Sequence, residues 1–327
     1  MGKKNSVRSK VSIIILNYNG KDIISKCISS CFKSNFPKTN LEVVVIDNNS
    51  SDGSYEFIKK NFPKVRIIKM QKNLGTASYN IAIRKTNGDF LFLLNNDDVL
   101  DPNCINHLIS TLKTSSEAGL CKPKGLNLDY KTKVIASGSW VSRSFYCGLI
   151  RKIVKPERII EIPYAGNVLI KREILDELGY LFDSDYFLYG EDLDLGLRVR
   201  LIGKKILYDP KAVMYHGESP TAKREFPLSH LVFLTERNLL VTFFKNTGTL
   251  RLFLYFPYVF GMRVFTVLRD IILLRPINSF ARIRAMLWII TNTGAIAKKR
   301  TETQRTRKAK DSYVFQIFSE KEMFGFM

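Results

Sequence analysis

The stretch VSIIILNYNG, residues Val11 to Gly20, is the strongest indication of the fold, because an unbroken apolar run ends abruptly in polar residues and a glycine. Similar apolar runs follow within the first hundred residues, at Leu41 to Ile46, Val65 to Met70 and Phe90 to Leu94. Stretches with helical patterns separate them. Near-continuous apolar strands joined through helices are typical of a parallel sheet covered on both faces. The sequence therefore predicts an α/β fold that binds its ligands beyond the carboxyl ends of the strands.

Polar residues follow each of the four predicted strands. They are Asn17 and Asn19 after the first strand, Asp47 to Ser54 after the second, Asn73 to Gly75 after the third, and Asn95 to Asp98 after the fourth. Any one of these runs is ordinary turn and helix-cap chemistry, with Asp52 a candidate N-cap. Their recurrence at one sheet edge indicates a binding site. A carboxylate such as Asp97, placed where an apolar strand ends, is a usual ligand for a metal that holds phosphates.

A second acidic block, FLYGEDLDLGLR, occupies residues Phe187 to Arg198. It clusters Glu191, Asp192 and Asp194 at a predicted helix start, where the helix dipole favours negative charge. Capping requires one acid rather than three, so one of these carboxylates is a candidate general base. The two acidic blocks together suggest transfer of a group from a nucleotide diphosphate donor.

Composition narrows the choice of partners. The 327 residues carry 51 Lys and Arg against 30 Asp and Glu, a formal charge of +21, which favours nucleotides, nucleic acid or an acidic membrane face. The basic residues crowd the two ends of the chain, so we expect no nucleic-acid partner. The start lacks an apolar run with a cleavage site, and the five cysteines show no zinc or disulfide spacing. Both observations predict a cytosolic enzyme.

The C-terminal third changes character. An apolar run from Leu250 to Leu274 is broken by Pro257 and Arg263, and a shorter one covers Ala285 to Ala297. Neither is a clean spanning segment or a clean amphipathic helix. Helices packed on the catalytic domain, an interfacial hairpin and a membrane span all remain open. The basic tract from Lys298 to Lys310 fits a peripheral helix pair held on an anionic leaflet.

Several of these runs resemble the inverting family 2 glycosyltransferases, in particular the rhamnosyltransferase-like branch that builds surface polysaccharides. Val11 to Gly20 is similar to the opening strand of that family, Val43 to Ser54 to its nucleoside-binding segment, and Asn73 to Asn80 to the helix start that follows. Phe187 to Arg198 matches the Glu-Asp-x-Asp/Glu-x-x-x-Arg helix start of the family. The resemblance covers about residues 10 to 240.

The resemblance implies a GT-A type fold, which is a Rossmann-like, mostly parallel sheet with helices on both faces, followed by a helical, apolar and basic extension. The expected organisation is a basic tail over residues 1–10, the GT-A domain over 11–235, a helical region over 236–297 for which membrane association is one interpretation, and a basic tail over 298–327.

The resemblance also implies roles for individual residues. Those expected to bind the donor nucleotide are Asn17, Asn19, Asp47, Asn80 and Asn95. Asn95 to Asp97 falls where the family has its Asp-x-Asp metal motif, with Asn replacing the first acid, so Asp97 is the expected carboxylate ligand and Asp98 its possible substitute. His216 resembles a histidine that completes the metal or diphosphate site, although a lone histidine is more often structural.

On the acceptor side, the resemblance implies Gly166, Asn167 and Asp194, with Asp194 also an organiser of the helix start. A glycine needed only for a backbone turn is an equal alternative for Gly166. Asp192 is the expected catalytic base and Glu191 its near alternative.

The predicted function is therefore inverting transfer of a sugar from a UDP- or dTDP-sugar, assisted by Mg²⁺ or Mn²⁺, to a glycan or lipid-linked acceptor. Surface polysaccharide or glycolipid assembly at the cytoplasmic face of the cell membrane, by a peripheral or weakly anchored enzyme, fits the resemblance. A non-enzymatic nucleotide or nucleic-acid binding protein is the alternative, which requires basic residues interleaved with aromatics over the folded domain. A nucleotidyltransferase usually opens on a Gly-rich phosphate loop, and Asn17 to Gly20 is not one.

Overall fold

The four predicted strands form one half of the central sheet. In a computed structural model that describes residues 9–153, 157–217 and 224–319, they are β1 (Val11–Asn17), β2 (Leu41–Asp47), β3 (Arg66–Lys69) and β4 (Phe90–Asn95). β1 lies between β2 and β4 and runs parallel to both, and β3 continues the sheet beyond β2. The predicted parallel sheet is confirmed. Most of the predicted N-terminal tail, residues 1–8, lies outside the described residues.

Beyond β4 the sheet reverses direction at one strand. β11 (Leu169–Lys171) is antiparallel to both β4 and β6 (Ala118–Asn127), and β12 (Lys205–His216) then runs parallel to β6. The short β5 (Asp98–Leu100) pairs with the end of β12, which brings His216 opposite Asp98. The remaining strands are β7 (Val134–Ala136), β8 (Ser139–Val141), β9 (Cys147–Leu149) and β10 (Ile160–Glu161). The β5–β12 pairing therefore joins two distant parts of the sequence at the sheet edge.

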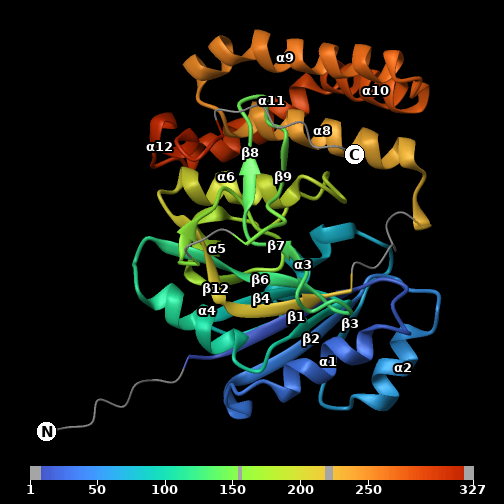
Figure 1. Cartoon of the computed structure of the whole chain (residues 1–327), viewed down its shortest axis with the longest axis vertical. Helices are drawn as coiled ribbons and strands as arrows, with labels where there is room; N and C mark the ends of the chain where they lie inside the picture. Colours follow the sequence, from blue (N-terminus) through green and yellow to red (C-terminus); the bar gives the residue numbers. More distant parts are fainter. Residues whose placement is uncertain (1–8, 154–156, 218–223, 320–327) are drawn as a thin grey trace, which may run out of the picture.

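Helices cover both faces of the sheet (Figure 1). Ile13 and Ile15 pack on one face with α1 (Ile24–Lys33), α2 (Ser54–Asn61) and α4 (Cys104–Lys113). Ile14 points to the other face, which is covered by α3 (Tyr79–Ile83), α5 (Glu173–Leu178) and α6 (Glu191–Leu201). The 3-10 helices are η1 (Lys38–Asn40) and η2 (Gly75–Ser78). Alternate strand residues thus fill two separate cores, as expected of a sheet buried on both faces.

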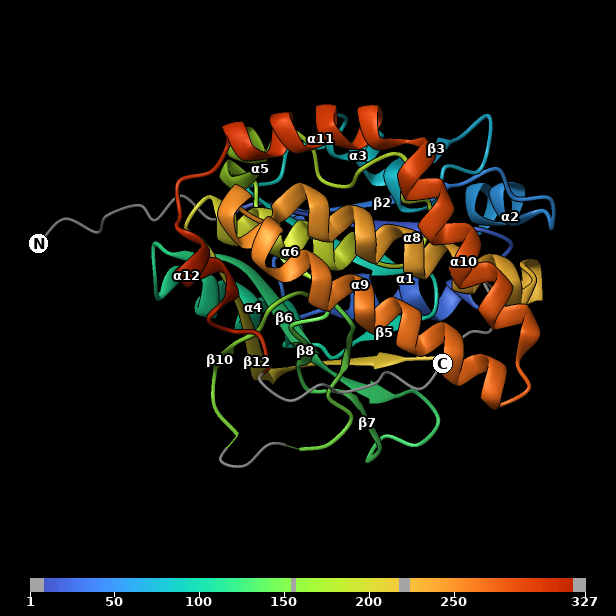
Figure 2. The same cartoon turned by 90° about the horizontal axis from the view of Figure 1, so that it is seen from above.

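The C-terminal third is helical, as predicted, and is stacked on α6. Its helices are α8 (Leu228–Asn246), α9 (Thr249–Ile272), α10 (Pro276–Thr291), α11 (Thr293–Arg305) and α12 (Asp311–Phe315). Leu193 and Leu197 of α6 share one apolar core with Phe243 of α8 and Ile296 of α11. The helical region begins with α8, so the predicted domain boundary at residue 235 falls inside a helix. α9 and α10 lie farthest from the sheet (Figure 1; Figure 2).

The basic tract from Lys298 to Lys310 differs from the expected tail, because much of it lies in α11 and packs on α8. Arg300 donates to the carbonyl oxygens of Phe244 and Thr247, and Arg307 to that of Asn246. These carbonyls lie at the C-terminal end of α8, where a helix leaves its last acceptors without partners. The charge run therefore caps a helix, which its sequence alone does not reveal. Residues 320–327 lie outside the described residues.

A buried ion network joins α6 to α8 directly beneath the acidic block. The Nζ atom of Lys245 lies 2.7 Å from Asp183 Oδ2 and 3.1 Å from an oxygen of Asp194, and all three side chains are buried. Arg198 Nε lies 2.9 Å from Asp194 Oδ2. This network fixes the orientation of α6, which carries Glu191 and Asp192 at its first turn.

We expect Lys245→Met to destabilise the protein by about 3–5 kcal/mol, because the change leaves two buried carboxylates without their shared cation. Urea unfolding measures this difference. The matched control is Lys308→Met, whose amine pairs with Glu177 at the surface, so that its loss costs less than about 1 kcal/mol. Equal effects for the two substitutions would contradict the structural role given to Lys245.

Candidate active site

Two adjoining hollows lie at the polar edge of the sheet. The first, of about 260 Å³, is lined by Tyr18, Asn48, Asn73, Gly75, Asn96, Asp97 and Phe226 among others. The second, of about 550 Å³, is lined among others by Lys122, Gly166, Asn167, Tyr189, Glu191 and Asp192. Their common walls are Leu16, Thr76, Asn95, Leu188 and His216. The two acidic blocks of the sequence therefore face one continuous cleft, as the topology of the sheet predicts.

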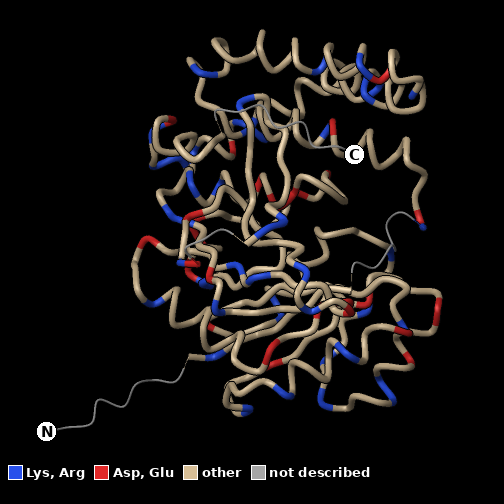
Figure 3. Tube along the Cα trace, in the orientation of Figure 1, with Lys and Arg blue, Asp and Glu red and all other residues tan. Residues whose placement is uncertain are grey.

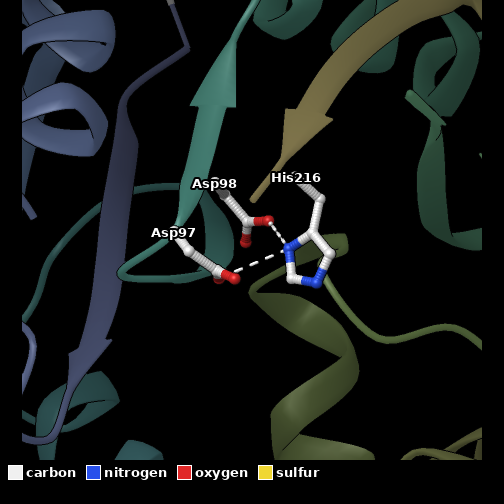
Figure 4. Close-up of side chains that lie close together, drawn as sticks. All are labelled: Asp97, Asp98 and His216. Atoms are coloured by element: carbon white, nitrogen blue, oxygen red, sulfur yellow. Dashed lines mark hydrogen bonds and ion pairs between the residues drawn. The ribbon is translucent and has the colours of Figure 1, made fainter. Parts of the chain in front are cut away.

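Asp97, Asp98 and His216 converge at the boundary between the two hollows (Figure 4). Their ligand atoms all lie within 4.8 Å of one another. His216 Nδ1 is 2.8 Å from Asp98 Oδ1 and 3.3 Å from Asp97 Oδ1. Asp98 is fully buried, and it also accepts hydrogen bonds from the backbone N–H of Asn95 and from Asn167 Nδ2. Both oxygens of Asp98 are thus already used, which leaves Asp97 as the better direct metal ligand.

The two carboxylates of this cluster favour a positive charge beside them. Burial by itself lowers the pKa of His216, but hydrogen bonds and charge interactions with Asp97 and Asp98 raise it to about 10. Burial raises the pKa of Asp98 in spite of its histidine partner. Two carboxylates and an imidazole are ligands that Mn²⁺ and Mg²⁺ sites accept, with the imidazole favouring Mn²⁺. The residues present therefore fit a divalent cation.

The residues expected to bind the nucleotide at the ends of β1 and β2 make hydrogen bonds that connect neighbouring loops. These residues are Asn17, Asn19 and Asp47. Asn17 is fully buried, accepts a hydrogen bond from Asn96 Nδ2 and lies 3.4 Å from Asp47 Oδ1, so it supports the wall rather than lining it. The side-chain oxygen of Asn19 accepts from the backbone N–H of Ser51. Asp47 Oδ2 is buried and has no hydrogen-bond partner within the described residues, which is unusual for a carboxylate oxygen.

The structure places Asn80 and Asp194 away from the cleft. The side chain of Asn80 hydrogen-bonds the backbone of Leu181 and Phe182, so it holds that segment and does not line either hollow. Asp194 is buried against Arg198 and Lys245, which corrects its expected place on the acceptor side. Residues two apart on a helix point in nearly opposite directions, so Asp192 and Asp194 cannot face the same cleft.

Glu191 and Asp192 both line the larger hollow at the start of α6. Burial, with a contribution from Asp192, raises the pKa of Glu191 to about 8, so its carboxyl is mostly protonated at neutral pH. Burial also raises the pKa of Asp192, but the backbone N–H of Leu193 and the cation of Lys122 oppose this rise. Asp192 is therefore the more readily ionised of the two neighbouring acids.

Two residues that the sequence interpretation missed help to form this site. Lys122 on β6 is buried, donates to the carbonyl oxygen of Gly166 at 3.0 Å, and lines the same hollow as Asp192. The signal for it is a lysine in the middle of a strand, directly after the apolar run AGLC that opens β6, because a buried cation requires a partner. Asn238 of α8 holds the loop before α6 by donating to the carbonyl oxygens of Tyr186, Leu188 and Tyr189. No local pattern marks Asn238.

The loop before α6 is also held from the nucleotide side. Phe187, Tyr189 and Gly190 all have positive φ angles, a conformation that is costly for the two aromatic residues. Gly75, with φ +57°, approaches this loop so closely that a Cβ atom there would lie 1.9 Å from the carbonyl oxygen of Phe187. Thr76 donates its backbone N–H to the same oxygen at 3.0 Å. The two sides of the cleft are thus rigidly connected.

Replacing Lys122 tests the protonation state of Asp192. In Lys122→Met the cation that lowers the pKa of Asp192 is gone, so this carboxylate becomes protonated at a higher pH. We expect the acidic limb of the pH–activity profile to move to higher pH. Lys124→Met is the control, because Lys124 lies on the same strand but pairs with Glu157 outside the cleft. An acidic limb that stays in place would contradict the account.

Comparison with known proteins identifies the family. The model of Glycosyl transferase family 2 matches residues 12–179, which is half of the chain. The chain belongs to this family. The expected family and enzyme class are therefore confirmed. Named glycosyltransferases are among its relatives, and none of those described below is a rhamnosyltransferase, so the branch stays a prediction.

Two curated relatives illustrate the range of these glycosyltransferases. The dolichyl N-acetyl-alpha-D-glucosaminyl phosphate 3-beta-D-2,3-diacetamido-2,3-dideoxy-beta-D-glucuronosyltransferase of Methanococcus voltae is 22% identical over 227 residues, which cover 65% of this chain and 68% of that enzyme. The poly(ribitol-phosphate) beta-glucosyltransferase of Bacillus spizizenii is 31% identical over 124 residues, which cover 36% of this chain and 20% of that enzyme. The match thus spans only about a fifth of the second relative.

Solved structures confirm the GT-A fold of this glycosyltransferase. TarS 1-349 of S. aureus superposes with a TM-score of 0.54 at 17% identity, covering 91% of this chain and 88% of that one. The mannosyltransferase PcManGT of Pyrobaculum calidifontis, in complex with GDP-Man and Mn2+, gives a TM-score of 0.53 at 17% identity, covering 95% and 86%. Because each covers more than nine-tenths of the chain, both likenesses include at least part of the C-terminal helices.

Proposed function

We propose that this glycosyltransferase transfers a sugar with inversion from a UDP- or dTDP-sugar, with a divalent cation, to an acceptor hydroxyl. One observation carries the proposal. A base candidate, Asp192, and a cation site, Asp97 with His216, lie on the walls of one continuous cleft. Inverting transfer requires this arrangement, because the acceptor must be deprotonated on one side of the sugar while the diphosphate leaves on the other.

Asp192 is the proposed base rather than Glu191. A base must be ionised at the working pH, and the pKa of Glu191 is raised to about 8 while Lys122 favours the ionised form of Asp192. Gly166 lies against Asp192, since a Cβ atom there would be 3.9 Å from Asp192 Oδ2. A larger side chain at Gly166 would take space beside the base. We therefore propose that Gly166 and Asn167 border the acceptor.

The proposed reaction is a single displacement. The acceptor oxygen forms a bond to the anomeric carbon as the bond between that carbon and the diphosphate oxygen breaks, and the electron pair leaves with the nucleotide diphosphate. Asp192 takes the hydroxyl proton from the acceptor. The loop held by Gly75 and Asn238 precedes α6 and keeps Asp192 in place.

Asp97 and His216 are the proposed ligands of the divalent cation, with Asp98 orienting His216. When bound, the cation supplies positive charge that stabilises the departing diphosphate. Asp98 contributes by fixing the imidazole through Nδ1, because a carboxylate that is hydrogen-bonded to a metal-binding histidine orients its ring. Asn95, which lines both hollows, is proposed to contact the donor ribose or the cation through its amide.

The donor nucleoside is proposed to bind beside Asp47, Asn17 and Asn19. The buried Oδ2 atom of Asp47, which lacks a partner within the described residues, suits the imide N–H that uracil and thymine share. Asn80, set back from the cleft, supports this side indirectly by holding Leu181 and Phe182. The solved structures of TarS 1-349 with UDP and of PcManGT with GDP-Man and Mn2+ are those of other proteins with this fold.

For the acceptor we propose a glycan or a lipid-linked sugar, in surface polysaccharide or glycolipid assembly at the cytoplasmic face of the cell membrane. The names of the relatives from Methanococcus and Bacillus, which act on a dolichyl phosphate sugar and on poly(ribitol-phosphate), support this class. The net charge of +21 suits an anionic membrane, and we propose no nucleic-acid partner.

The test is release of nucleotide diphosphate from a panel of UDP-, dTDP- and GDP-sugars, measured with Mn²⁺, with Mg²⁺ and with a chelator. The proposal predicts release from a uracil or thymine donor that stops when the metal is chelated. Lipid-linked and soluble glycan acceptors are supplied in parallel, so that a missing acceptor does not hide the activity. Release that persists without metal, or none from any donor with any acceptor, contradicts the proposal.

A further inference from the structure

The two outermost helices expose their apolar residues and bury their polar ones. The exposed large side chains of α9 are all apolar or aromatic, and they are Leu250, Phe253, Leu254, Phe256, Tyr258, Phe260, Val264, Phe265, Leu268, Ile271 and Ile272. The buried side of α9 includes Arg263, Thr266 and Asp270 instead. A helix on the surface of a soluble domain shows the opposite arrangement.

α10 and the turn before it continue the same surface. Ile277, Phe280, Leu287 and Ile290 are exposed on α10, while Arg282 is buried. Leu273 and Leu274 in the turn are exposed too, with Leu274 at 87%. The exposed apolar residues of α9, of this turn and of α10 together are the outer apolar surface. So many neighbouring exposed aliphatic and aromatic side chains mark a surface that another apolar phase covers.

The buried charges of the two helices form ion pairs with one another and with α8. Asp270 of α9 and Glu236 of α8 pair with Arg282 of α10, and Glu236 also lies 3.0 Å from Arg263 Nε. Tyr146 donates to Glu236. This network binds the inner sides of α9 and α10 to α8. The outer apolar surface therefore lies on the opposite sides of the two helices and runs parallel to their axes.

We propose that the outer apolar surface lies flat in the interface of an anionic lipid bilayer, without crossing it. By length and composition α9 is the one helix among the described residues that could span a membrane. A spanning α9 would carry Arg263 and Asp270 into hydrocarbon and would separate them from Glu236 and Arg282. Lying flat, the helix keeps this network and still buries its apolar side.

Charge decides between a bilayer and a second copy of this chain. Over residues 249–291, all of them described, the only acidic residue is Asp270, which is buried, whereas Arg275 and Arg284 are exposed. Figure 3 shows how few charged residues lie along these helices. A twofold dimer through this surface would bring arginines together without carboxylates to pair with them. Anionic lipid headgroups supply the missing negative charge.

The experiment is flotation of the full chain with phosphatidylcholine vesicles, with and without phosphatidylglycerol. The chain should float with the anionic vesicles. Leu254→Glu with Leu268→Glu should weaken partitioning at least about tenfold, because two exposed leucines no longer enter the interface. Arg275→Gln with Arg284→Gln should reduce binding to anionic vesicles by about fivefold for each arginine. Leu228→Glu, an exposed leucine outside the surface, is the control and should bind normally.

Thermal unfolding of each variant is the control for folding. We expect unchanged unfolding temperatures, because the substituted side chains are exposed. Three results overturn the inference: vesicle binding that survives both glutamates, a soluble dimer that the glutamates dissociate, or resistance to alkaline extraction, which marks a spanning protein. The inference depends on this surface alone, so its failure is distinct from failure of the proposed transfer reaction.

Discussion

Asp192→Asn should lower the rate of sugar transfer by about 10³-fold, because the amide cannot accept the proton of the acceptor hydroxyl. Asn keeps the size of the side chain, and its oxygen can still accept the backbone N–H of Leu193, which donates to Asp192 Oδ1 at 2.8 Å. Donor binding should therefore be unchanged. Steady-state kinetics with the accepted donor, alongside calorimetric nucleotide binding, separate the loss in kcat from any loss in affinity.

The matched comparison is Glu191→Gln. Since the raised pKa of Glu191, about 8, keeps its carboxyl mostly protonated at neutral pH, glutamine is close to its existing form. We expect less than about a tenfold loss in rate. If Glu191→Gln were inactive and Asp192→Asn active, the assignment of the base would be reversed.

Asp97→Ala should reduce metal-dependent release of nucleotide diphosphate by about 100-fold or more, because the carboxylate that holds the cation is lost. Mn²⁺ binding, measured directly by titration calorimetry, should weaken in parallel, which gives a readout that does not depend on activity. His216→Ala should show the same pattern with a smaller loss.

Asp22→Ala is the control for this substitution, since Asp22 is an exposed carboxylate outside the cleft. It should leave both Mn²⁺ affinity and rate at the values of the unaltered chain. Normal Mn²⁺ affinity in Asp97→Ala would show that the cation binds elsewhere.

The part of the site at the sheet edge could be predicted because it depends on local patterns. The apolar run of β1 predicts the strand, and the polar residues that follow it mark its carboxyl end, where ligands bind in such sheets. The same holds for β4, where Asp97 lies two residues after the end of the strand. His216 lies 119 positions after Asp97, and its pairing with Asp98 depends on the β5–β12 ladder, which no local pattern indicates. Only the resemblance to the family suggested a place for His216 at the metal or diphosphate site.

The parts that could not be predicted depend on partners far away in the sequence. Asn80 looked like a donor ligand, but its amide is taken by backbone groups about a hundred residues later. The basic tract was interpreted as a tail, because nothing local shows that Arg300 and Arg307 cap α8. The place of Asp194, in contrast, could have been predicted without distant partners. Residues two apart on a helix point in nearly opposite directions, which puts Asp194 opposite Asp192.

The most direct test of the account is the anomeric configuration of the product, determined by NMR spectroscopy after transfer from the accepted donor in the presence of Mn²⁺. A single displacement with Asp192 as base predicts a product whose anomeric configuration is opposite to that of the donor sugar. A product that retains the configuration of the donor would contradict the proposed displacement and the role of Asp192 in it.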